Sequence, residues 1–433
     1  MTERNLSEIA ADAKAAALVL ARLDTKTKNR VLQAMAAQIE NHCAEILEAN
    51  RKDLEFAKKE NIPDSLVARL AVDETKVRDM AQGIRSVSGL PDPVGQKQGT
   101  MELDDGLELT RVSCPIGVIG AIFESRPDAV PQISSLCFKS GNAVILKGGV
   151  EAQHSNRVIA GLIQQALSEV EGVPAAAVQL IETRAEVAEM LKQDQYINLV
   201  VPRGSNQFVR YVQENTKIPV LGHSEGLCHV YIDKEADTDK AIRVALDSKL
   251  QYAAACNAME TLLVHEGIAP NVLPSLMAQL REKEVELVGC LKTCSLIPDL
   301  KKAEAGDWDA EYNNLKLSVK LVDDMTEAID HINTHGSGHT DTIVTENREK
   351  AERFMNDVDS ASVMVNASTR FADGFRFGLG AEIGISTNKT HARGPVGLEG
   401  LVIYKYKLVG DGQIVADYSG KNGKSFKHKP LDA

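Results

Sequence analysis

The sequence predicts an α/β fold of the doubly wound, nucleotide-binding type. Two apolar runs, at 116–123 and 143–146, lack the alternation of a half-exposed strand, and each is followed by a turn and a stretch with helical spacing. Strands that are apolar on both faces are typical of parallel sheets covered by helices. Strand, glycine-containing turn and helix in alternation is the pattern of a nucleotide-binding sheet. At 433 residues the chain is long enough for two or more domains.

The composition is that of an ordinary globular protein, with 43% hydrophobic and 25% charged residues. A formal charge of −12 argues against a nucleic-acid or anionic membrane partner. The sequence has neither a membrane-spanning apolar stretch nor the apolar core of a signal peptide. Its seven cysteines form no regular framework, so we expect free thiols in a reducing cytoplasm.

The N-terminal part is predicted to be helical over 6–23, 24–50 and 64–87, with Asp24 as a helix start signal. At 101–114 the period changes to alternation, and Asp105-Gly106 marks a hairpin turn. A lone hairpin is marginally stable, and the alternating segment 401–408 would be a natural partner strand. The two together suggest an oligomerisation flap and a homo-oligomer. A hairpin packed within its own subunit has equal weight.

The alternating α/β part begins at Pro115. A helix is expected to start with Pro127 at its first position, another spans about 151–170, and 202–205 opens a third. A strand is expected at 197–201. The later strands are predicted at 230–233, 261–265, 286–288, 342–345 and 361–366, and the later helices at 237–250, 272–284, 325–334 and 348–357.

These elements suggest three parts. Residues 1–229 with 367–400 would form a nucleotide-binding domain that carries the hairpin, and 230–366 a second domain that carries Cys256. Residues 401–433 would supply the oligomerisation strand and a tail. The glycine-rich stretch 374–400 is predicted as a loop, ordered or flexible, and 420–433 as a frayed tail.

Cys256 is the leading candidate nucleophile. It lies in 251–264, QYAAACNAMETLLV, where small residues leave room for a reactant beside the thiol and Asn257 follows it. Taken alone, the window favours a buried core cysteine, because free cysteine is among the most buried residue types. Its place after the nucleotide-binding strands and before a histidine-bearing loop puts it between two domains, where binding clefts usually form.

Lys147 and Gly204-Ser205 are candidates for a phosphate site. The start of a helix offers free N–H groups and a positive dipole end, and glycine lets a pyrophosphate approach closely. A lysine at the end of the neighbouring strand would reach ribose or phosphate. The pattern is not GxGxxG, so a glycine that merely permits a tight turn is the competing interpretation.

Three histidines, His331, His335 and His339, have a spacing that invites a metal interpretation. Gly336 and Gly338 are expected to end the helix before the third, and no HExxH motif is present. Cys290 and Cys294 have no second pair to complete a zinc site. We therefore expect no metal, and a polar edge of an active site or a solvated helix end instead.

Five segments together resemble the aldehyde dehydrogenase superfamily: IGVIGAIFESRP, AVILKGG, RGSNQFVRYV, AACNAMETLLVH and EAIDHINTHGSGHTDTIVT. Within it, GHSEGLCHVYID and the histidine pattern at 322–343 resemble the branch that reduces glutamyl 5-phosphate in proline biosynthesis. The resemblance runs from the N-terminal helices to about Lys407. It implies a Rossmann-type cofactor domain, an α/β catalytic domain and a small β oligomerisation flap.

The resemblance also implies roles for individual residues. Cys256 matches the catalytic thiol, Lys147 the lysine near the cofactor ribose, and Gly204-Ser205 the turn over the pyrophosphate. Glu311 matches a ribose-contacting glutamate. The further candidates for contact with the substrate or its leaving phosphate are Ser125, Arg126, His223, Asn257 and His335. For Arg126, a clamp on a phosphate or carboxylate and a salt bridge to a neighbouring carboxylate have equal weight.

Two departures from the wider superfamily bear on the chemistry. Ser125-Arg126 stand where a typical member has an asparagine for the oxyanion, and 222–226, GHSEG, stand where it has Glu-Leu-Gly-Gly with the general base. A thiolate that displaces phosphate, followed by hydride transfer, needs no base to activate water. Glu225 would be a base only if the alignment slips.

The resemblance thus implies NADPH-dependent reduction of L-glutamyl 5-phosphate to L-glutamate 5-semialdehyde through a Cys256 thioester. The absence of a carboxylate directly after Lys147 favours NADPH over NADH. Glutamate 5-kinase, which makes the acyl phosphate, is the candidate protein partner. The alternatives are an NAD(P)-dependent aldehyde dehydrogenase that hydrolyses its thioester, and a binding protein that keeps the fold without turnover.

Overall fold

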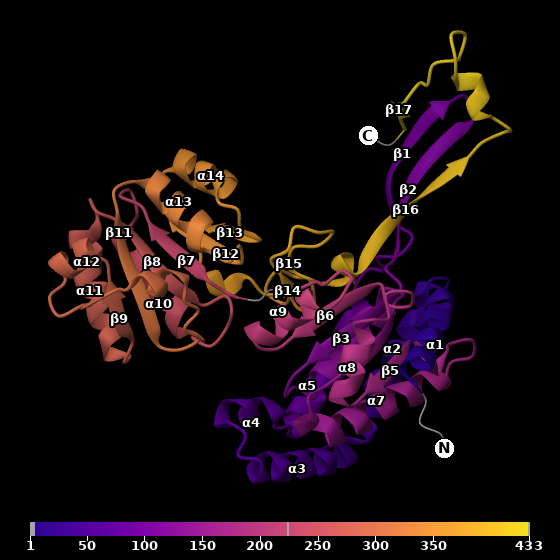
Figure 1. The fold of residues 1–433 in the computed structure, drawn as a ribbon, viewed down its shortest axis with the longest axis horizontal. Coiled ribbons are helices and arrows are strands. Elements are labelled where there is room, and N and C mark those ends of the chain that lie inside the picture. Colours follow the sequence, from indigo (N-terminus) through magenta and orange to yellow (C-terminus); the bar gives the residue numbers. More distant parts are fainter. Residues whose placement is uncertain (1–4, 223–224, 432–433) are drawn as a thin grey trace.

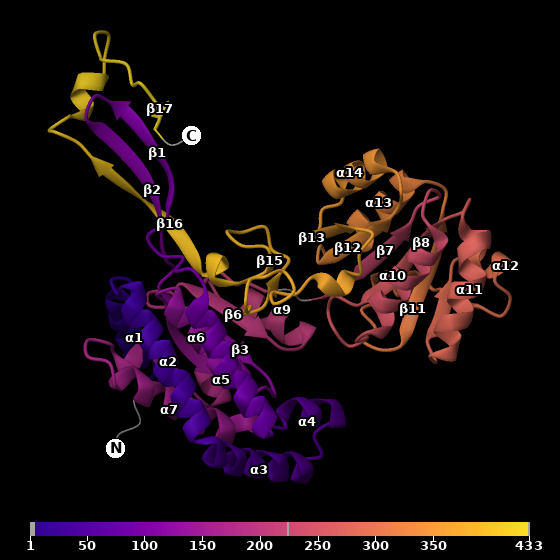
Figure 2. The same ribbon diagram turned by 180° about the vertical axis from the view of Figure 1, so that it is seen from behind.

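The computed structural model describes residues 5–222 and 225–431, and divides them into two α/β domains and a projecting antiparallel sheet (Figure 1). The reverse view shows the same separation, with the projecting sheet pointing away from both α/β domains (Figure 2). His223 and Ser224 lie outside the described residues, so the role expected for His223 stays a prediction.

The first domain is built on a four-stranded parallel sheet of order β5-β4-β3-β6. Its strands are β3 (Val118–Phe123), β4 (Ala143–Lys147), β5 (Val178–Ile181) and β6 (Leu199–Arg203). Every residue of β3 and β4 is buried, as expected for strands covered on both faces. The strand expected at 197–201 begins two residues later. The edge strand β5 is short, and the sequence did not predict it.

In the described part of this domain the helices run from α1 to α9, with α2 and α5 packed over α6 and α7. They are α1 (Leu6–Leu20), α2 (Thr25–Asn41), α3 (Cys43–Lys59), α4 (Asp64–Leu70), α5 (Glu74–Gly89), α6 (Ala129–Lys139), α7 (Gln153–Ser168), α8 (Arg184–Met190) and α9 (Asn206–Glu214). The expected helix over 64–87 is two helices, because the Asp73 side chain accepts from the Lys76 N–H at 2.7 Å and starts a new one. The helix expected from Pro127 begins at Ala129.

The second domain carries a seven-stranded parallel sheet of order β10-β9-β11-β8-β7-β12-β13. Its strands are β7 (Cys228–Ile232), β8 (Met259–His265), β9 (Glu286–Gly289), β10 (Lys301–Lys302), β11 (Lys316–Val322), β12 (Thr340–Val344) and β13 (Ser362–Val365). Its helices are α10 (Thr238–Leu250), α11 (Ala269–Glu282), α12 (Leu291–Leu296), α13 (Met325–His335) and α14 (Arg348–Asp357). The expected boundary between residues 229 and 230 falls inside β7.

The projecting sheet, which we call the flap, has the order β16-β2-β1-β17. The predicted hairpin is confirmed as β1 (Lys97–Asp104) and β2 (Leu107–Pro115). The predicted partner is confirmed as β16 (Val402–Val409), antiparallel to β2. The tail expected to fray pairs with β1 instead, through β17 (Lys429–Pro430), and Phe426 stacks on Tyr418 at 4.5 Å between ring centroids.

After β13 the chain returns to the first domain. The glycine-rich stretch is ordered by packing, because Ile383, Val396, Leu398 and Leu401 belong to the core of that domain. The Asn142 side chain also donates a hydrogen bond to the Leu401 carbonyl at 2.8 Å. Short elements mark this return: β14 (Ile385–Ser386), β15 (Gly394–Pro395) and 3₁₀ turns at Thr369–Phe371 and Leu398–Leu401.

Across the described residues, no helix combines the length and apolarity that a membrane crossing requires. All seven cysteines are free thiols.

Candidate active site

The cysteine singled out by the sequence lies in the loop between α10 and β8. Short turns shape this loop, since the Ala255 N–H donates to the Tyr252 carbonyl and the Ala258 N–H to the Ala255 carbonyl. Cys256 is half-buried. Its carbonyl accepts a hydrogen bond from the Cys228 thiol at 3.3 Å, which ties the loop to the start of β7. The thiol is therefore held by a backbone fixed beside the first residues of β7 and β8, while it stays partly accessible.

Asn257 anchors this loop. Its side chain is buried, and Nδ2 donates to the Ala372 carbonyl at 2.9 Å on the return segment. The amide group is thus engaged with backbone beneath the loop. Its observed contact is structural, and the substrate contact expected for it stays a prediction.

Gly226 permits the closest backbone approach at the site. A Cβ added there would lie 2.1 Å from the Cys256 carbonyl oxygen and 2.7 Å from its Cα. Real Cβ atoms do not come so close to backbone atoms, so only glycine allows the segment before β7 to lie against the cysteine. Glu225, which precedes it, forms an ion pair with Arg210. That pairing places the Glu225 carboxylate on α9 rather than beside the thiol.

The expected phosphate site lies at the carboxyl ends of the neighbouring strands β4, β3 and β6, where ligands bind in such sheets. Lys147 ends β4 and is buried, and Gly204-Ser205 connect β6 to α9. Ser205 caps α9, its Oγ accepting from the Phe208 N–H at 3.4 Å. Lys147 and the Gly204-Ser205 turn thus flank the end of β3.

Glu124 directly follows the strand β3 and adds a carboxyl group that was not predicted from the sequence as part of the site. Its carboxylate lies about 3.0 Å from where a Cβ on Gly204 would be, and the Ser205 backbone N–H faces it. Desolvation first and the neighbouring Glu151 second raise the pKa of Glu124, while the Ser205 N–H and Lys147 lower it. The Glu124 carboxyl group thus faces the backbone N–H of Ser205, the residue that precedes α9.

Ser125 is buried and has a positive φ of 39°. Its backbone N–H and its hydroxyl both donate to one Glu151 oxygen, at 2.6 and 2.7 Å. The Glu151 carboxylate is therefore turned toward the β3–α6 connection. Ser125 thus forms a sharp turn, held by Glu151, immediately before Arg126.

Glu311 joins the two domains. One of its oxygens accepts from Asn206 Nδ2 at 2.7 Å, at the first residue of α9, and the other accepts from the Gly226 N–H at 2.9 Å. The residue expected to contact ribose thus lies at the start of the same helix as the expected pyrophosphate turn. It also holds the segment that touches Cys256.

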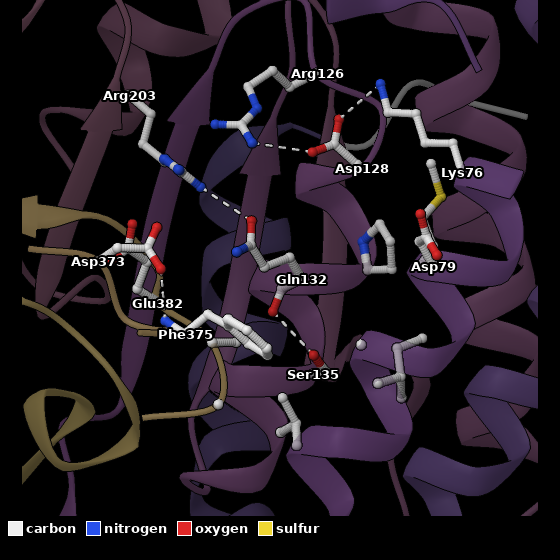
Figure 3. Close-up of a pocket in the computed structure, with 17 residues that line it drawn as sticks. Lys76, Asp79, Arg126, Asp128, Gln132, Ser135, Arg203, Asp373, Phe375 and Glu382 are labelled. Atoms are coloured by element: carbon white, nitrogen blue, oxygen red, sulfur yellow. Dashed lines mark hydrogen bonds and ion pairs between the residues drawn. The ribbon is translucent and has the colours of Figure 1, made fainter. Parts of the chain in front are cut away.

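A cavity of about 480 Å³ lies in the first domain, between α5, α6, the end of β6 and the return segment (Figure 3). Arg126 lines it and forms an ion pair with Asp128 at 3.1 Å, so the salt bridge weighed for Arg126 is present. Lys76 reaches the same carboxylate at 3.4 Å. Glu382 and Asp373 enter from the return segment.

Arg203 connects this cavity to the cysteine. It ends β6, lines the cavity and donates to the Gln132 side chain at 3.3 Å. Burial, and then the neighbouring Arg126 cation, lower the pKa of Arg203 to about 10, whereas Glu382, Asp128 and Cys256 raise it. The Cys256 charge also raises the pKa of Arg370, which burial lowers. Two guanidinium groups are therefore within electrostatic reach of the thiol.

The three histidines do not converge on one point. His335 pairs with Asp309 at 2.7 Å. The buried His331 packs on the His335 ring, with 4.5 Å between the ring centroids, and His339 is buried beside Cys228. Burial, above all, lowers the pKa of His331 to about 2, so its ring is neutral. No cluster of three or more His, Cys, Asp or Glu side chains in the described ranges has an arrangement that would hold a metal ion.

The site therefore combines residues that local patterns predicted with others that they did not. Cys256, Lys147, Gly204-Ser205 and Glu311 were expected from the sequence. Sequence reasoning missed a further group with charged side chains, namely Glu124, Arg203, Arg370, Asp373 and Glu382. For Arg203 a signal existed, since a charged residue directly after a buried parallel strand lies at the ligand-binding edge of the sheet.

Comparison with known proteins agrees with this arrangement. The model of the aldehyde dehydrogenase family matches residues 1–288 and 317–381. A protein of Acetivibrio thermocellus named gamma-glutamyl phosphate reductase is 55% identical over 428 residues, covering 99% of both chains. One of the same name from Methanosarcina mazei is 54% identical over 429 residues, covering 97% of this chain and 96% of its own.

Solved structures give the same result. The crystal structure of gamma-glutamyl phosphate reductase from Thermotoga maritima has a TM-score of 0.93 at 42% identity, covering 95% of this chain and all of its own (100%). Glyceraldehyde-3-phosphate dehydrogenase GapN from Methanocaldococcus jannaschii, complexed with NADP, has a TM-score of 0.67 at 16% identity, with 94% of each chain covered. The second likeness concerns the fold alone.

Proposed function

The chain belongs to the aldehyde dehydrogenase family and, within it, to the gamma-glutamyl phosphate reductases, and from that premise we propose that Cys256 carries the reaction through a thioester. The enzyme is an oxidoreductase of proline biosynthesis. The reaction converts L-glutamyl 5-phosphate to L-glutamate 5-semialdehyde and inorganic phosphate. The roles of individual residues, the nicotinamide cofactor and the assembly belong to the proposal.

The Cys256 thiolate attacks the acyl carbon of the substrate. A carbon–sulfur bond forms, the carbon–oxygen bond to phosphate breaks, and phosphate leaves with the electron pair of that bond. Arg203 and Arg370, which both interact electrostatically with Cys256, are the proposed cations beside the reacting sulfur. When bound, NADPH supplies a hydride to the thioester carbon. Collapse of the resulting hemithioacetal oxyanion releases the aldehyde and regenerates the thiolate.

The oxyanion needs a hydrogen-bond donor. The backbone N–H of Cys256 is the proposed donor, because it moves with the sulfur and needs no side chain to be placed. Such a donor contributes roughly 3–4 kcal/mol to stabilising the transition state. The Asn257 amide is engaged by Ala372 in this structure, so it is not assigned this role.

The residues at the carboxyl ends of β4, β3 and β6 fit a nicotinamide dinucleotide. The turn before α9 places the Ser205 N–H against the Glu124 carboxyl group, and the start of a helix favours an anion such as a pyrophosphate. Lys147 is proposed for the ribose and Gly204-Ser205 for the pyrophosphate. Glu311 is proposed for the second ribose. No carboxylate directly follows Lys147 in the sequence, which supports NADPH over NADH, although the Glu151 carboxylate, bound to Ser125, lies against Gly149.

One observation carries the proposal. Glu311 bonds both to the first residue of α9 and to Gly226, and Gly226 lies against the Cys256 backbone. A short path of contacts therefore connects the proposed dinucleotide turn to the proposed nucleophile. Glu225, the base that a shifted alignment would supply, is paired with Arg210 instead. This pairing supports a thioester that awaits hydride rather than water.

The test is oxidation of glutamate 5-semialdehyde followed as NADPH formation, with and without phosphate, using NADP and NAD side by side. Strict phosphate dependence and a preference for NADP are expected. The Cys256→Ser variant is expected to lose at least ~10³-fold of kcat, while Cys294→Ser, the matched control on α12, retains activity. Turnover that ignores phosphate would favour the hydrolytic alternative, and an active Cys256→Ser variant would refute the nucleophile.

Assembly and location complete the proposal. The flap presents Tyr404, Tyr406 and Leu408 with 50%, 60% and 57% of their surface exposed, which supports the expected homo-oligomer. The free thiols support the expected cytoplasmic location. Glutamate 5-kinase stays the proposed partner, because it supplies the labile acyl phosphate.

A further inference from the structure

Apart from Arg203, the charged side chains that line this cavity have no role in the proposed chemistry at Cys256. Cations gather at one side, where Arg126 follows β3 and Arg203 ends β6. Two carboxylates, Asp373 and Glu382, lie next to each other on the return segment, and two more, Asp79 and Asp128, lie on the side of Lys76 and Arg126 (Figure 3). The volume of about 480 Å³ is within the range of small-molecule sites.

The cationic side is incompletely neutralised. Asp128 is shared between Arg126 and Lys76, at 3.1 and 3.4 Å. Arg203 makes no ion pair within 4.0 Å among the described residues, and its guanidinium donates to the neutral Gln132 amide. The Arg203 guanidinium is therefore available to a ligand carboxylate, which an arginine can bind in bidentate fashion.

The carboxylate side is incompletely neutralised as well. The Glu382 carboxylate accepts from the Gly374 N–H at 2.8 Å, and burial raises the pKa of Glu382. Asp373 has Arg376 at 3.5 Å as its cation partner. A ligand ammonium placed beside Glu382 would supply the missing positive charge. A ligand with one carboxylate and one ammonium, close together, matches both sides at once.

We propose that this cavity is the binding site for the α-amino-acid end of the substrate, with Arg203 and Arg126 holding the α-carboxylate and Glu382 the α-ammonium. The proposal rests on the proposed function, which supplies an acyl group at Cys256. In a glutamyl chain the α-carbon is three C–C bonds of about 1.5 Å each from the acyl carbon. Arg203 is suited to this span, because it lines the cavity and is also within electrostatic reach of the thiol.

The charges also exclude simpler occupants. Inorganic phosphate would meet Asp373 and Glu382 without a cation of its own. A dicarboxylate such as glutarate would satisfy Arg203 but leave Glu382 without an ammonium. Specificity therefore comes from the two ends of the cavity together, Arg203 for the carboxylate and Glu382 for the ammonium. Loss of either side chain should remove the discrimination against ligands that lack the matching group.

Binding of three ligands to the full-length protein tests the proposal by isothermal titration calorimetry. They are L-glutamate, 4-aminobutyrate, which lacks the α-carboxylate, and glutarate, which lacks the α-ammonium. Wild-type protein should prefer L-glutamate over each by about 10- to 100-fold, the range for hydrogen bonds to charged groups. Arg203→Gln should abolish the preference over 4-aminobutyrate only, and Glu382→Gln the preference over glutarate only.

Two controls separate binding from folding. Arg203→Lys should restore part of the preference, and Arg85→Gln, which removes an arginine paired with Glu40 elsewhere on α5, should leave it unchanged. Unchanged preferences in folded Arg203→Gln and Glu382→Gln proteins, or displacement of L-glutamate by phosphate alone, would overturn the proposal.

Kinetics distinguish this proposal from the proposed function. In the phosphate-dependent assay, Arg203→Gln should lower the ratio of kcat/KM for the semialdehyde to kcat/KM for propanal by at least tenfold. An equal loss with both aldehydes would assign Arg203 to the thiol instead. If wild-type protein showed no phosphate-dependent turnover but kept the ligand preferences, the proposed function would fail while the amino-acid site stood.

Discussion

Replacement of Gly226 by alanine tests the backbone approach on which the position of the thiol depends. The new Cβ would lie 2.1 Å from the Cys256 carbonyl oxygen and 2.7 Å from its Cα. Ordinary van der Waals contact begins near 3.4 Å, so the two segments must separate by more than about 1 Å. A misplacement of about 1 Å costs on the order of 100-fold in rate, or ~2.7 kcal/mol of transition-state stabilisation.

The assay is phosphate-dependent NADPH formation with the semialdehyde, and kcat/KM should fall about 100-fold in Gly226→Ala. The rate at which iodoacetamide alkylates Cys256 should change as well, because the thiol leaves its cationic surroundings. Gly161→Ala is the matched control, since a Cβ there meets nothing within 4 Å and lies on α7. A folded Gly226→Ala enzyme with activity within threefold of wild type would refute the reasoning.

Three further perturbations concern the support of the site. Lys249 and Glu260 form a buried ion pair at 2.6 Å, so Lys249→Met or Glu260→Leu alone leaves a buried charge unpaired and should lower the free energy of unfolding by about 3–5 kcal/mol, seen as a lower Tm. The double variant should recover most of this loss. Additive losses in the double variant would contradict the pairing. Burial raises the pKa of Glu260 from 4.5 to about 7, so its contribution to stability is present below pH 4.5 and lost as the pH rises through 7. Between pH 4.5 and 7, the Tm of the wild-type protein should therefore fall relative to the Tm of the double variant. A Tm difference that does not change with pH would count against the raised pKa of Glu260. Asn257→Ala should lower the free energy of unfolding by about 1–3 kcal/mol by leaving the Ala372 carbonyl without its donor, with loss of kcat; unchanged thermal unfolding would contradict the anchor.

The sequence predicted those parts of the fold that depend on local pattern. The strands β3 and β4 were found because their residues are apolar or small, apart from Lys147 at the end of β4, as expected for strands covered on both faces. The hairpin was found from Asp105-Gly106, and its partner from alternation. The strand β11 was missed because Lys316 and Lys320 interrupt its apolar run, although Lys316 reaches Asp307 and Lys320 reaches Glu327 at the sheet margin.

The site divides in the same way. Cys256 and Gly204-Ser205 belong to short, contiguous motifs, so the sequence indicated them. The amino-acid cavity brings together Arg203 from β6, Arg126 from the β3–α6 turn and Glu382 from the return segment. Nothing local marks these residues as neighbours, because tertiary packing alone assembles them. The tail was misjudged for the same reason, since its partner β1 lies far away in the sequence.

The return of the chain to its first domain has a consequence for biosynthesis. The core of that domain lacks Ile383, Val396, Leu398 and Leu401 until the last part of the chain is made, and the flap contact between Tyr418 and Asp104 spans 314 residues. At the usual 5–20 residues per second, a ribosome needs roughly 15–60 s to cover that span. Meanwhile the second domain, made of one continuous segment, can fold by itself. The second domain can therefore be complete in the nascent enzyme before the first domain is. The β1–β2 hairpin has no partner strand until β16 has been synthesised, near the end of translation.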